Sequence, residues 1–346
     1  MKTFTTIAGL TVVFAAIASE RICHPRFYAD PTLWKGADGK YYAYATTGGS
    51  GMLQYLSSDD ALTWKPTGKC PFAKELRTRI YEGWKAVWAP DHAVIQGENR
   101  LYVTLYNSAD DSAIGMFRLR GGETGEAYDL HIITHSKQTG IRDTIDPEVV
   151  SDPDTGRLWL FFGSVGMIHR VELASDGLSV KSGAKYVHVA GSTDKEDPTR
   201  ATVFEGSYLH RRNGWWYLFV SAGRFQDKSY CIRVGRARTL EGEFLDRNGR
   251  KMTDGFATIV IETEGNEFYG PGHNGDFLVG SDGVERIYYH SHWRKLDRPK
   301  RRSPRIMLAR RLVWDAEGWP RTISDAPANA PAGALEMKPQ RGNDSK

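Results

Sequence analysis

The sequence predicts an all-β protein, a five-bladed β-propeller. Short strand-like runs of aromatic and aliphatic residues dominate the chain, and five of them recur at a nearly constant period. The runs are Tyr41–Thr46, Leu101–Asn107, Leu158–Ser164, Trp215–Ser221 and Ile287–Ser291. Their starts are separated by 60, 57, 57 and 72 residues, and each run follows a turn that contains Gly, Asp or Asn. A propeller blade of four strands takes about 40–50 residues or more, whereas a two-sheet sandwich requires no constant period.

The composition excludes several classes of protein. The chain has 346 residues, with 46 Lys and Arg against 42 Asp and Glu, 12% aromatic residues and 3 Cys. Abundant aromatic residues and a low net charge argue against disorder. The small number of cysteines argues against a disulfide scaffold. The absence of a long internal apolar run argues against a membrane span. The net charge of +4 does not favour nucleic acid. The one basic cluster, residues 298–305, is short and broken by two prolines, so we interpret it as a solvated loop.

The two ends of the chain differ from the repeats. Residues 1–18 combine one Lys, an apolar run and an Ala-Ile-Ala ending, a pattern that predicts a secretory signal peptide, although a first helix is the alternative. The protein is therefore expected to be secreted or periplasmic. Residues 19–324 form the predicted propeller, and residues 325–346 form a flexible tail. Export permits one disulfide among the three cysteines, and Cys23 with Cys70 is the expected pair.

Acidic residues precede four of the five repeated strands at similar distances. The acids are Asp30, Asp91, Asp146 and Glu205, which lie 10 to 12 residues before each strand, and His273 takes this place in the fifth repeat. Equivalent positions in a closed ring converge on its axis, so these side chains are expected to meet at one mouth of the central channel. Any single member is also explained as a turn residue. Converging carboxylates raise one another's pKa and are useful for metal binding or for acid/base chemistry.

The aromatic residues point toward a sugar ligand. Glycoside hydrolysis needs one carboxylic acid to protonate the leaving oxygen and a second carboxylate to activate water or attack the sugar. The rings of Trp34, Trp84 and Trp88 are candidates for stacking on sugar faces, with packing between blades as the alternative. His290 and His292 share a strand face but lack further partners at zinc-ligand spacing.

In these features the sequence resembles glycoside hydrolase family 43, the five-bladed propellers of arabinanases, β-xylosidases and arabinofuranosidases. The resemblance extends from about Phe27 to Pro320 and rests on motifs that stand in the family's order. They are Ala29-Asp30-Pro31, Trp88-Ala-Pro-Asp91, Ile145-Asp146-Pro147, Phe204-Glu205-Gly206, Gly270-Pro-Gly-His-Asn274 and Trp314-Asp-Ala-Glu-Gly-Trp-Pro320.

The resemblance implies a role for each residue. Asp30 would be the general base, Glu205 the general acid, and Asp146 would hold that acid and raise its pKa. Such enzymes invert the anomeric centre, which predicts a separation of roughly 6.5–9.5 Å between the carboxyl groups of base and acid. Trp88 would contact the substrate, and Asp91 would be structural. His273 would hold a calcium or similar ion, largely through water, or else only hydrogen-bond the central Asp.

We therefore expect a secreted inverting glycoside hydrolase that cleaves α-L-arabinofuranosyl linkages of arabinan in plant cell-wall polysaccharide. The alternatives are a β-xylosidase or arabinoxylan arabinofuranosidase of the same family, and a non-catalytic carbohydrate-binding propeller.

Two positions near the expected pocket depart from the family pattern. Many arabinanases have His at the position of Ala29, and they have a small–apolar pair at the position of Gly275-Asp276. Endo or exo action stays open. No organic cofactor is expected. We expect a monomer, because a closed ring has no sheet edge that needs a partner.

Overall fold

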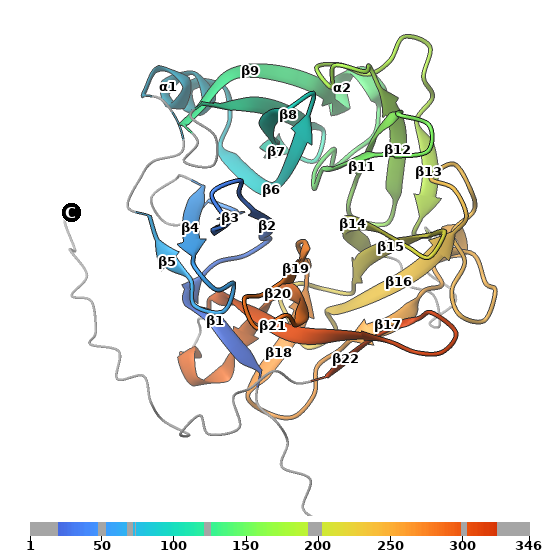
Figure 1. Cartoon of the computed structure of the whole chain (residues 1–346). Helices are drawn as coiled ribbons and strands as arrows, with labels where there is room; N and C mark the ends of the chain where they lie inside the picture. Colours follow the sequence, from blue (N-terminus) through green and yellow to red (C-terminus); the bar gives the residue numbers. More distant parts are fainter. Residues whose placement is uncertain are drawn as a thin grey trace, which may run out of the picture.

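The fold prediction is confirmed: five antiparallel sheets surround a common centre (Figure 1). The computed structural model describes residues 20–47, 53–67, 72, 74–120, 126–192, 203–298 and 303–323. The predicted signal peptide, the C-terminal tail and Cys70 lie outside these residues. None of the helices in the described ranges is long and apolar enough to cross a membrane.

Four blades consist of four strands in sequence order, and the fifth is larger. Blade 1 contains β2 (Thr32–Lys35), β3 (Tyr41–Ala45), β4 (Gln54–Ser58) and β5 (Lys65–Pro66). Blade 2 contains β6 (Ala86–Ile95), β7 (Glu98–Ser108), β8 (Asp111–Arg120) and β9 (Glu126–His135). Blade 3 contains β10 (Glu148–Ser151), β11 (Leu158–Phe162), β12 (Ile168–Leu173) and β13 (Val187–Ala190). Blade 4 contains β14 (Phe204–Arg212), β15 (Trp215–Ala222), β16 (Cys231–Ala237) and β17 (Thr258–Ile261).

Blade 5 joins the two ends of the described chain. It contains β18 (Phe268–Gly272), β19 (Phe277–Val279), β20 (Glu285–Trp293), β21 (Arg305–Trp314), β22 (Pro320–Ile323) and, from the N-terminal side, β1 (Arg21–Phe27). Strand β1 pairs with β21, so the first described strand completes the last sheet and closes the ring. Short helices lie between strands: α1 (Lys74–Gly83), α2 (Ser136–Thr139), η2 (Met252–Asp254) and η3 (Arg294–Leu296).

The predicted recurrent runs are the second strands of the five blades, β3, β7, β11, β15 and β20. They are continuously apolar because both faces of a blade are covered by neighbouring blades. In β15, the side chains of Trp216 and Leu218 pack toward blade 3, whereas those of Tyr217 and Phe219 pack toward blade 5. Five apolar clusters of this kind fill the five spaces between adjacent sheets. The period of two in a strand thus divides each run between two cores.

A ring of hydrogen bonds joins the innermost strands around the channel. In each blade, one side-chain oxygen accepts from a backbone N–H of the next blade. The pairs are Thr32 with His92 N (3.1 Å), Asp91 with Val149 N (2.8 Å), Glu148 with Leu209 N (3.0 Å), Tyr208 with Phe277 N (3.2 Å) and Asp276 with Leu33 N (2.7 Å). The bond from blade 5 to blade 1 completes the circle. The inner strands are therefore fixed relative to one another by polar contacts as well as by apolar packing.

Candidate active site

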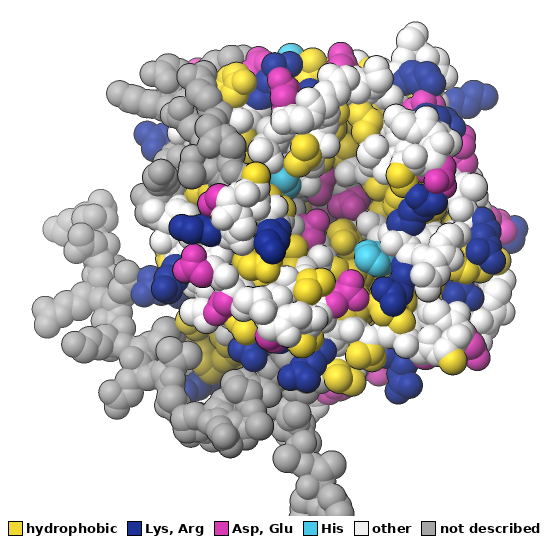
Figure 2. All heavy atoms as spheres, viewed as in Figure 1, with side chains coloured by type: hydrophobic (Ala, Val, Ile, Leu, Met, Phe, Trp, Pro, Cys, Tyr) yellow, Lys and Arg dark blue, Asp and Glu magenta, His cyan; other side chains and the backbone are white. Residues whose placement is uncertain are grey.

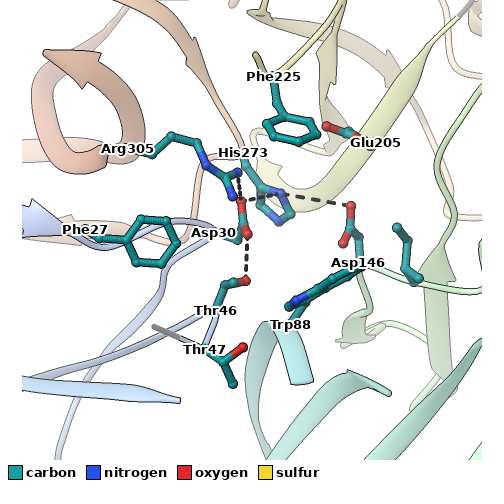
Figure 3. A pocket seen from close by; sticks show the side chains of 11 residues that line it. Phe27, Asp30, Thr46, Thr47, Trp88, Asp146, Glu205, Phe225, His273 and Arg305 are labelled. Atoms are coloured by element: carbon teal, nitrogen blue, oxygen red, sulfur yellow. Dashed lines mark hydrogen bonds and ion pairs between the residues drawn. The ribbon is translucent and has the colours of Figure 1, made fainter. Parts of the chain in front are cut away.

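A pocket of about 290 Å³ opens at one end of the channel. Figure 2, which views the ring from the side opposite to Figure 3, shows a hollow with acidic side chains on its floor at the other end of the channel as well. The lining of the pocket is drawn from all five blades: Phe27, Asp30, Thr46, Thr47, Trp88, Ile145, Asp146, Glu205, Phe225, His273 and Arg305. The structure thus brings together the predicted residues Asp30, Asp146, Glu205, Trp88 and His273 (Figure 3).

Left-handed backbone turns direct these side chains into the pocket. Near the entry of each inner strand one residue has a positive φ: Asp30 (55°), Ala89 (37°), Asp146 (55°), Gly206 (58°) and His273 (47°). Aspartate is among the residues that tolerate this region best. Register shifts mark the same place where β6, β14 and β18 pair with their neighbours, which are the β-bulges that re-aim side chains.

Asp30 is buried among cationic and polar partners. Its Oδ1 lies 3.0 Å from Arg305 Nη1, 3.3 Å from His273 Nδ1 and 3.2 Å from His290 Nδ1, and its Oδ2 accepts a 2.6 Å hydrogen bond from Thr46 Oγ1. Burial alone would raise the pKa of Asp30, but the charges of Arg305 and His273 and the His290 hydrogen bond outweigh it and hold the pKa well below the usual range. Asp30 is therefore an ionised carboxylate, as a base requires.

Asp146 has the opposite electrostatic environment. Burial, followed by the neighbouring carboxylates of Glu205 and Asp30, raises its pKa well above the usual value. Its backbone N–H donates to Thr104 Oγ1 at 2.9 Å, and its Oδ2 lies 4.0 Å from His273 Nδ1. The pKa values of two acids in one pocket are thus shifted in opposite directions, an arrangement that separates acid from base functions.

Glu205 is held by two hydroxyl groups that the sequence did not suggest. Tyr230 donates its phenolic proton to Oε1 at 2.6 Å, and Ser164 donates to Oε2 at 2.7 Å. Burial and the charge of Glu205 raise the pKa of Tyr230 well above its usual value, so the phenol keeps its proton. Both carboxylate oxygens of Glu205 are therefore oriented from outside its own strand pair.

Arg305 is a third residue that the sequence analysis missed. The interpretation of residues 298–305 as a solvated loop is wrong for Arg305, which begins β21 and reaches the pocket. Its guanidinium lies 4.8 Å from the ring centre of Phe225 and 5.8 Å from that of Phe27, in addition to its ion pair with Asp30. The three side chains form one wall of the pocket (Figure 3). An arginine in a Pro-rich basic run gives no signal in the sequence that separates it from surface arginines.

The tryptophans have different positions. Trp88 lines the pocket, and its ring stacks on Tyr106 with centroids 4.3 Å apart. Trp34 stacks on His92 at 4.1 Å within the core between blades 1 and 2, and Trp84 packs against the same core. Core packing therefore explains Trp34 and Trp84, whereas Trp88 is available to a ligand.

His273 lies between the carboxylates of Asp30 and Asp146 (Figure 3). Its Nδ1 faces both acids, and its backbone N–H donates to Ser221 Oγ at 2.6 Å. Among the described residues, no group of three or more His, Cys, Asp and Glu side chains is arranged to hold a metal ion. Calcium takes six to eight oxygen ligands. The protein would supply few of them, so these residues fit only an ion that is held largely through water.

The repeat spacing wrongly predicts that Asp91 joins the other acids at this mouth, whereas the structural role that the family resemblance implies agrees with its position. Ala89 occupies the position that corresponds to Asp30 and Asp146, and Asp91 lies two residues further along β6. There it belongs to the inter-blade ring and lines a second cavity of about 240 Å³ with Glu148 and Asp276. Burial and then the charge of Asp276 raise the pKa of Asp91 to about 8, against the Val149 N–H and the Glu148 hydrogen bond. Asp91 is therefore a structural acid.

An Asp91→Asn variant should change how stability depends on pH. The folded pKa of Asp91, about 8, lies above the ordinary value of 3.8. Its contribution to stability is thus present at low pH and is lost as pH rises toward and through 8. Asparagine keeps an oxygen for Val149 N–H and cannot ionise. The melting temperature of the variant should therefore exceed that of the parent by more near pH 9 than near pH 5, as measured by circular dichroism. A difference of the same size at both pH values would contradict this.

Comparison with known proteins gives one family. The model for "Glycosyl hydrolases family 43" matches residues 22–320. A relative from Aspergillus flavus, described as "Probable arabinan endo-1,5-alpha-L-arabinosidase C", is 30% identical over 337 residues, which cover 91% of this chain and 98% of the relative. "Extracellular endo-alpha-(1->5)-L-arabinanase 1" from Bacillus subtilis is 28% identical and covers 92% of each chain.

A solved structure shares the fold. The Cellvibrio cellulosa alpha-L-arabinanase complexed with arabinohexaose superposes with a TM-score of 0.71 and 24% identity, covering 86% of this chain and 95% of that one. At this identity the likeness supports the architecture, and the pocket described above supplies the chemistry.

Proposed function

This chain belongs to glycosyl hydrolases family 43, and from that membership and the chemistry of the pocket we propose that it hydrolyses the α-1,5-L-arabinofuranosyl linkages of arabinan with inversion. The observation that carries the proposal is the meeting of Asp30, Asp146 and Glu205 in one pocket of about 290 Å³. A non-catalytic sugar-binding propeller would not need three carboxylates at the cost of their mutual repulsion. The relatives described as arabinan-cleaving enzymes support the choice of substrate.

In the proposed reaction, Asp30 is the general base. Its ionised carboxylate accepts a proton from a water molecule as the water attacks the anomeric carbon. Arg305 and His273 keep Asp30 ionised before the attack. Glu205 gives its proton to the departing glycosidic oxygen. Asp146 would modulate the pKa of Glu205, because two neighbouring carboxyl groups disfavour the ionisation of both, and the raised pKa of Asp146 supports this coupling. The expected separation of roughly 6.5–9.5 Å between the carboxyl groups of Asp30 and Glu205 stays a prediction.

The further parts of the proposal concern calcium and export. A calcium ion held through water near His273 would add positive charge beside the carboxylates. Residues 1–18 are proposed to direct export, and the description of the Bacillus subtilis relative as extracellular supports this. In that location the substrate would be plant cell-wall polysaccharide.

A substrate panel tests the proposed function. Purified protein is incubated with linear α-1,5-arabinan, β-1,4-xylan and an aryl α-L-arabinofuranoside, with added calcium or with EDTA, and the products are sized by chromatography. We expect arabino-oligosaccharides or arabinose from arabinan, release of the aryl group from the arabinofuranoside, and no product from xylan. Turnover should be lower in EDTA, and calcium should restore it. Oligosaccharides would indicate endo action, and single sugars exo action. Release of xylose would favour the β-xylosidase alternative, and binding without turnover the carbohydrate-binding propeller.

A further inference from the structure

Two aromatic rings lie stacked directly behind the pocket. Tyr230, which precedes β16 in blade 4, and His290, in β20 of blade 5, are both 0% exposed. Their ring centres are 5.7 Å apart and their planes differ by 13°. Neither ring lines the pocket, so neither is placed to contact a substrate.

Each ring holds a different carboxylate of the pocket. The Tyr230 hydroxyl donates to Glu205 Oε1 at 2.6 Å. On the other ring, His290 Nδ1 lies 3.2 Å from Asp30 Oδ1 and also 3.2 Å from the Asp30 backbone nitrogen. Burial lowers the pKa of His290 to about 3, so its ring stays neutral. The proposed acid and the proposed base are thus connected by one pair of rings in van der Waals contact.

The local sequence leaves this pair no alternative position. Gly272 is the partner of His290 across β18 and β20. A Cβ added at Gly272 would lie 1.9 Å from Cε1 of Tyr230, far inside contact distance. Glycine at this position therefore lets the Tyr230 ring lie flat against the backbone of β18 and reach His290. The Gly-Pro-Gly segment before His273 has a physical purpose here besides placing His273.

We propose that Tyr230 and His290 are positioning residues which together set the separation between the carboxylates of Glu205 and Asp30. This inference rests on the proposed function. An inverting hydrolase must leave room for one water between base and sugar, and displacements of about 1 Å cost much of the rate. Two fully buried, stacked rings are a rigid spacer, because packing leaves no free volume for them to tilt.

Two variants retain an aromatic ring at each position, and they therefore distinguish this positioning role from packing alone. Tyr230→Phe removes only the hydroxyl that orients the acid. His290→Phe removes the Nδ1 that orients the base, and it also replaces Nε2 and introduces a larger ring. In the described part of the chain, His290 Nε2 has no hydrogen-bond partner, so phenylalanine loses nothing on that side. The matched control is Tyr289→Phe, which loses a buried 2.6 Å hydrogen bond to Glu20 outside the pocket.

The two variants should have different kinetic signatures. With Tyr230→Phe we expect kcat on arabinan to fall about 10- to 100-fold, the loss expected for one hydrogen bond to a charged group. The loss should be much smaller on an aryl arabinofuranoside with a good leaving group. Because a carboxylate that loses a donor favours its protonated form, the basic limb of the kcat profile should move to higher pH. His290→Phe should lose kcat equally on both substrates, and KM should change little in either variant.

The control and the parent enzyme decide between the possible results. Tyr289→Phe should retain the parent's activity and pH profile on both substrates. Unchanged kinetics in Tyr230→Phe, or an equal loss on both substrates with an unmoved pH profile, would overturn the spacer role while the parent's activity still upholds the proposed function. If the parent hydrolyses neither substrate, the proposed function fails and this assignment fails with it. Thermal unfolding is measured for each variant, and if His290→Phe does not fold, the leaving-group signature of Tyr230→Phe decides.

Discussion

A Glu205→Gln variant is expected to lose about 10²- to 10⁴-fold of kcat on arabinan, the range that a positioned general acid contributes. Glutamine is nearly isosteric and can still meet the hydroxyls of Tyr230 and Ser164, which hold Glu205 in the parent. It has no acidic proton for the leaving oxygen. An aryl arabinofuranoside whose leaving group departs without protonation should therefore retain much of its turnover. Initial rates on the two substrates, measured side by side, give this comparison.

The control for this variant is Ser164→Ala. It removes one of the two hydroxyl donors but leaves the acid in place, so it should cost far less on arabinan than Glu205→Gln does. Equal losses of Glu205→Gln on both substrates would contradict the role of Glu205 as the acid.

An Asp30→Asn variant is expected to lose a comparable factor, but on both substrates alike. The amide oxygen can accept from Arg305 while the amide NH2 donates to the hydroxyl of Thr46, so the side chain can keep its position. It cannot take a proton from the attacking water, a step that every leaving group shares. The measurement is the ratio of kcat on arabinan to kcat on the aryl glycoside. This ratio should stay near that of the parent, while both kcat values fall.

Asp91→Asn is the matched control for Asp30→Asn. It neutralises another buried acid of the channel, in the second cavity and outside the pocket. Its activity at mildly acidic pH should equal the parent's. Retention of aryl glycosidase activity by Asp30→Asn would instead assign the base to another group.

The blades could be predicted from the sequence because each second strand is covered on both faces. Continuous apolar runs such as Trp215–Ser221 result, and runs of this kind stand out without any alignment. The position of each acid along the channel axis was harder to predict than the blades. Counting back from the second strand placed Asp91 beside Asp30, but the hairpins differ in length and the inner strands carry bulges. A shift of two residues moves a side chain from one cavity to the other.

The partners of the acids could not be predicted because they come from other blades or, for Tyr230, from a different strand of the same blade. Tyr230 is 25 residues from Glu205 in the sequence, and Arg305 is 275 residues from Asp30. Ser164 is 41 residues from Glu205. Their contacts depend on how neighbouring sheets pack, and no local pattern encodes that packing.

The pairing of β1 with β21 bears on how this chain folds as it is made. Arg21 aligns with Ala309, so the partner of the first described strand is synthesised only after the first four blades. Until then, the nascent chain can build its early blades, but the face of blade 1 that packs on blade 5 stays uncovered. Closure of the ring is a contact of very high sequence separation, and such contacts slow folding. A segment fused ahead of Arg21 would have to leave β1 free to reach blade 5, and deletion of β1 would expose β21 as an unpaired edge.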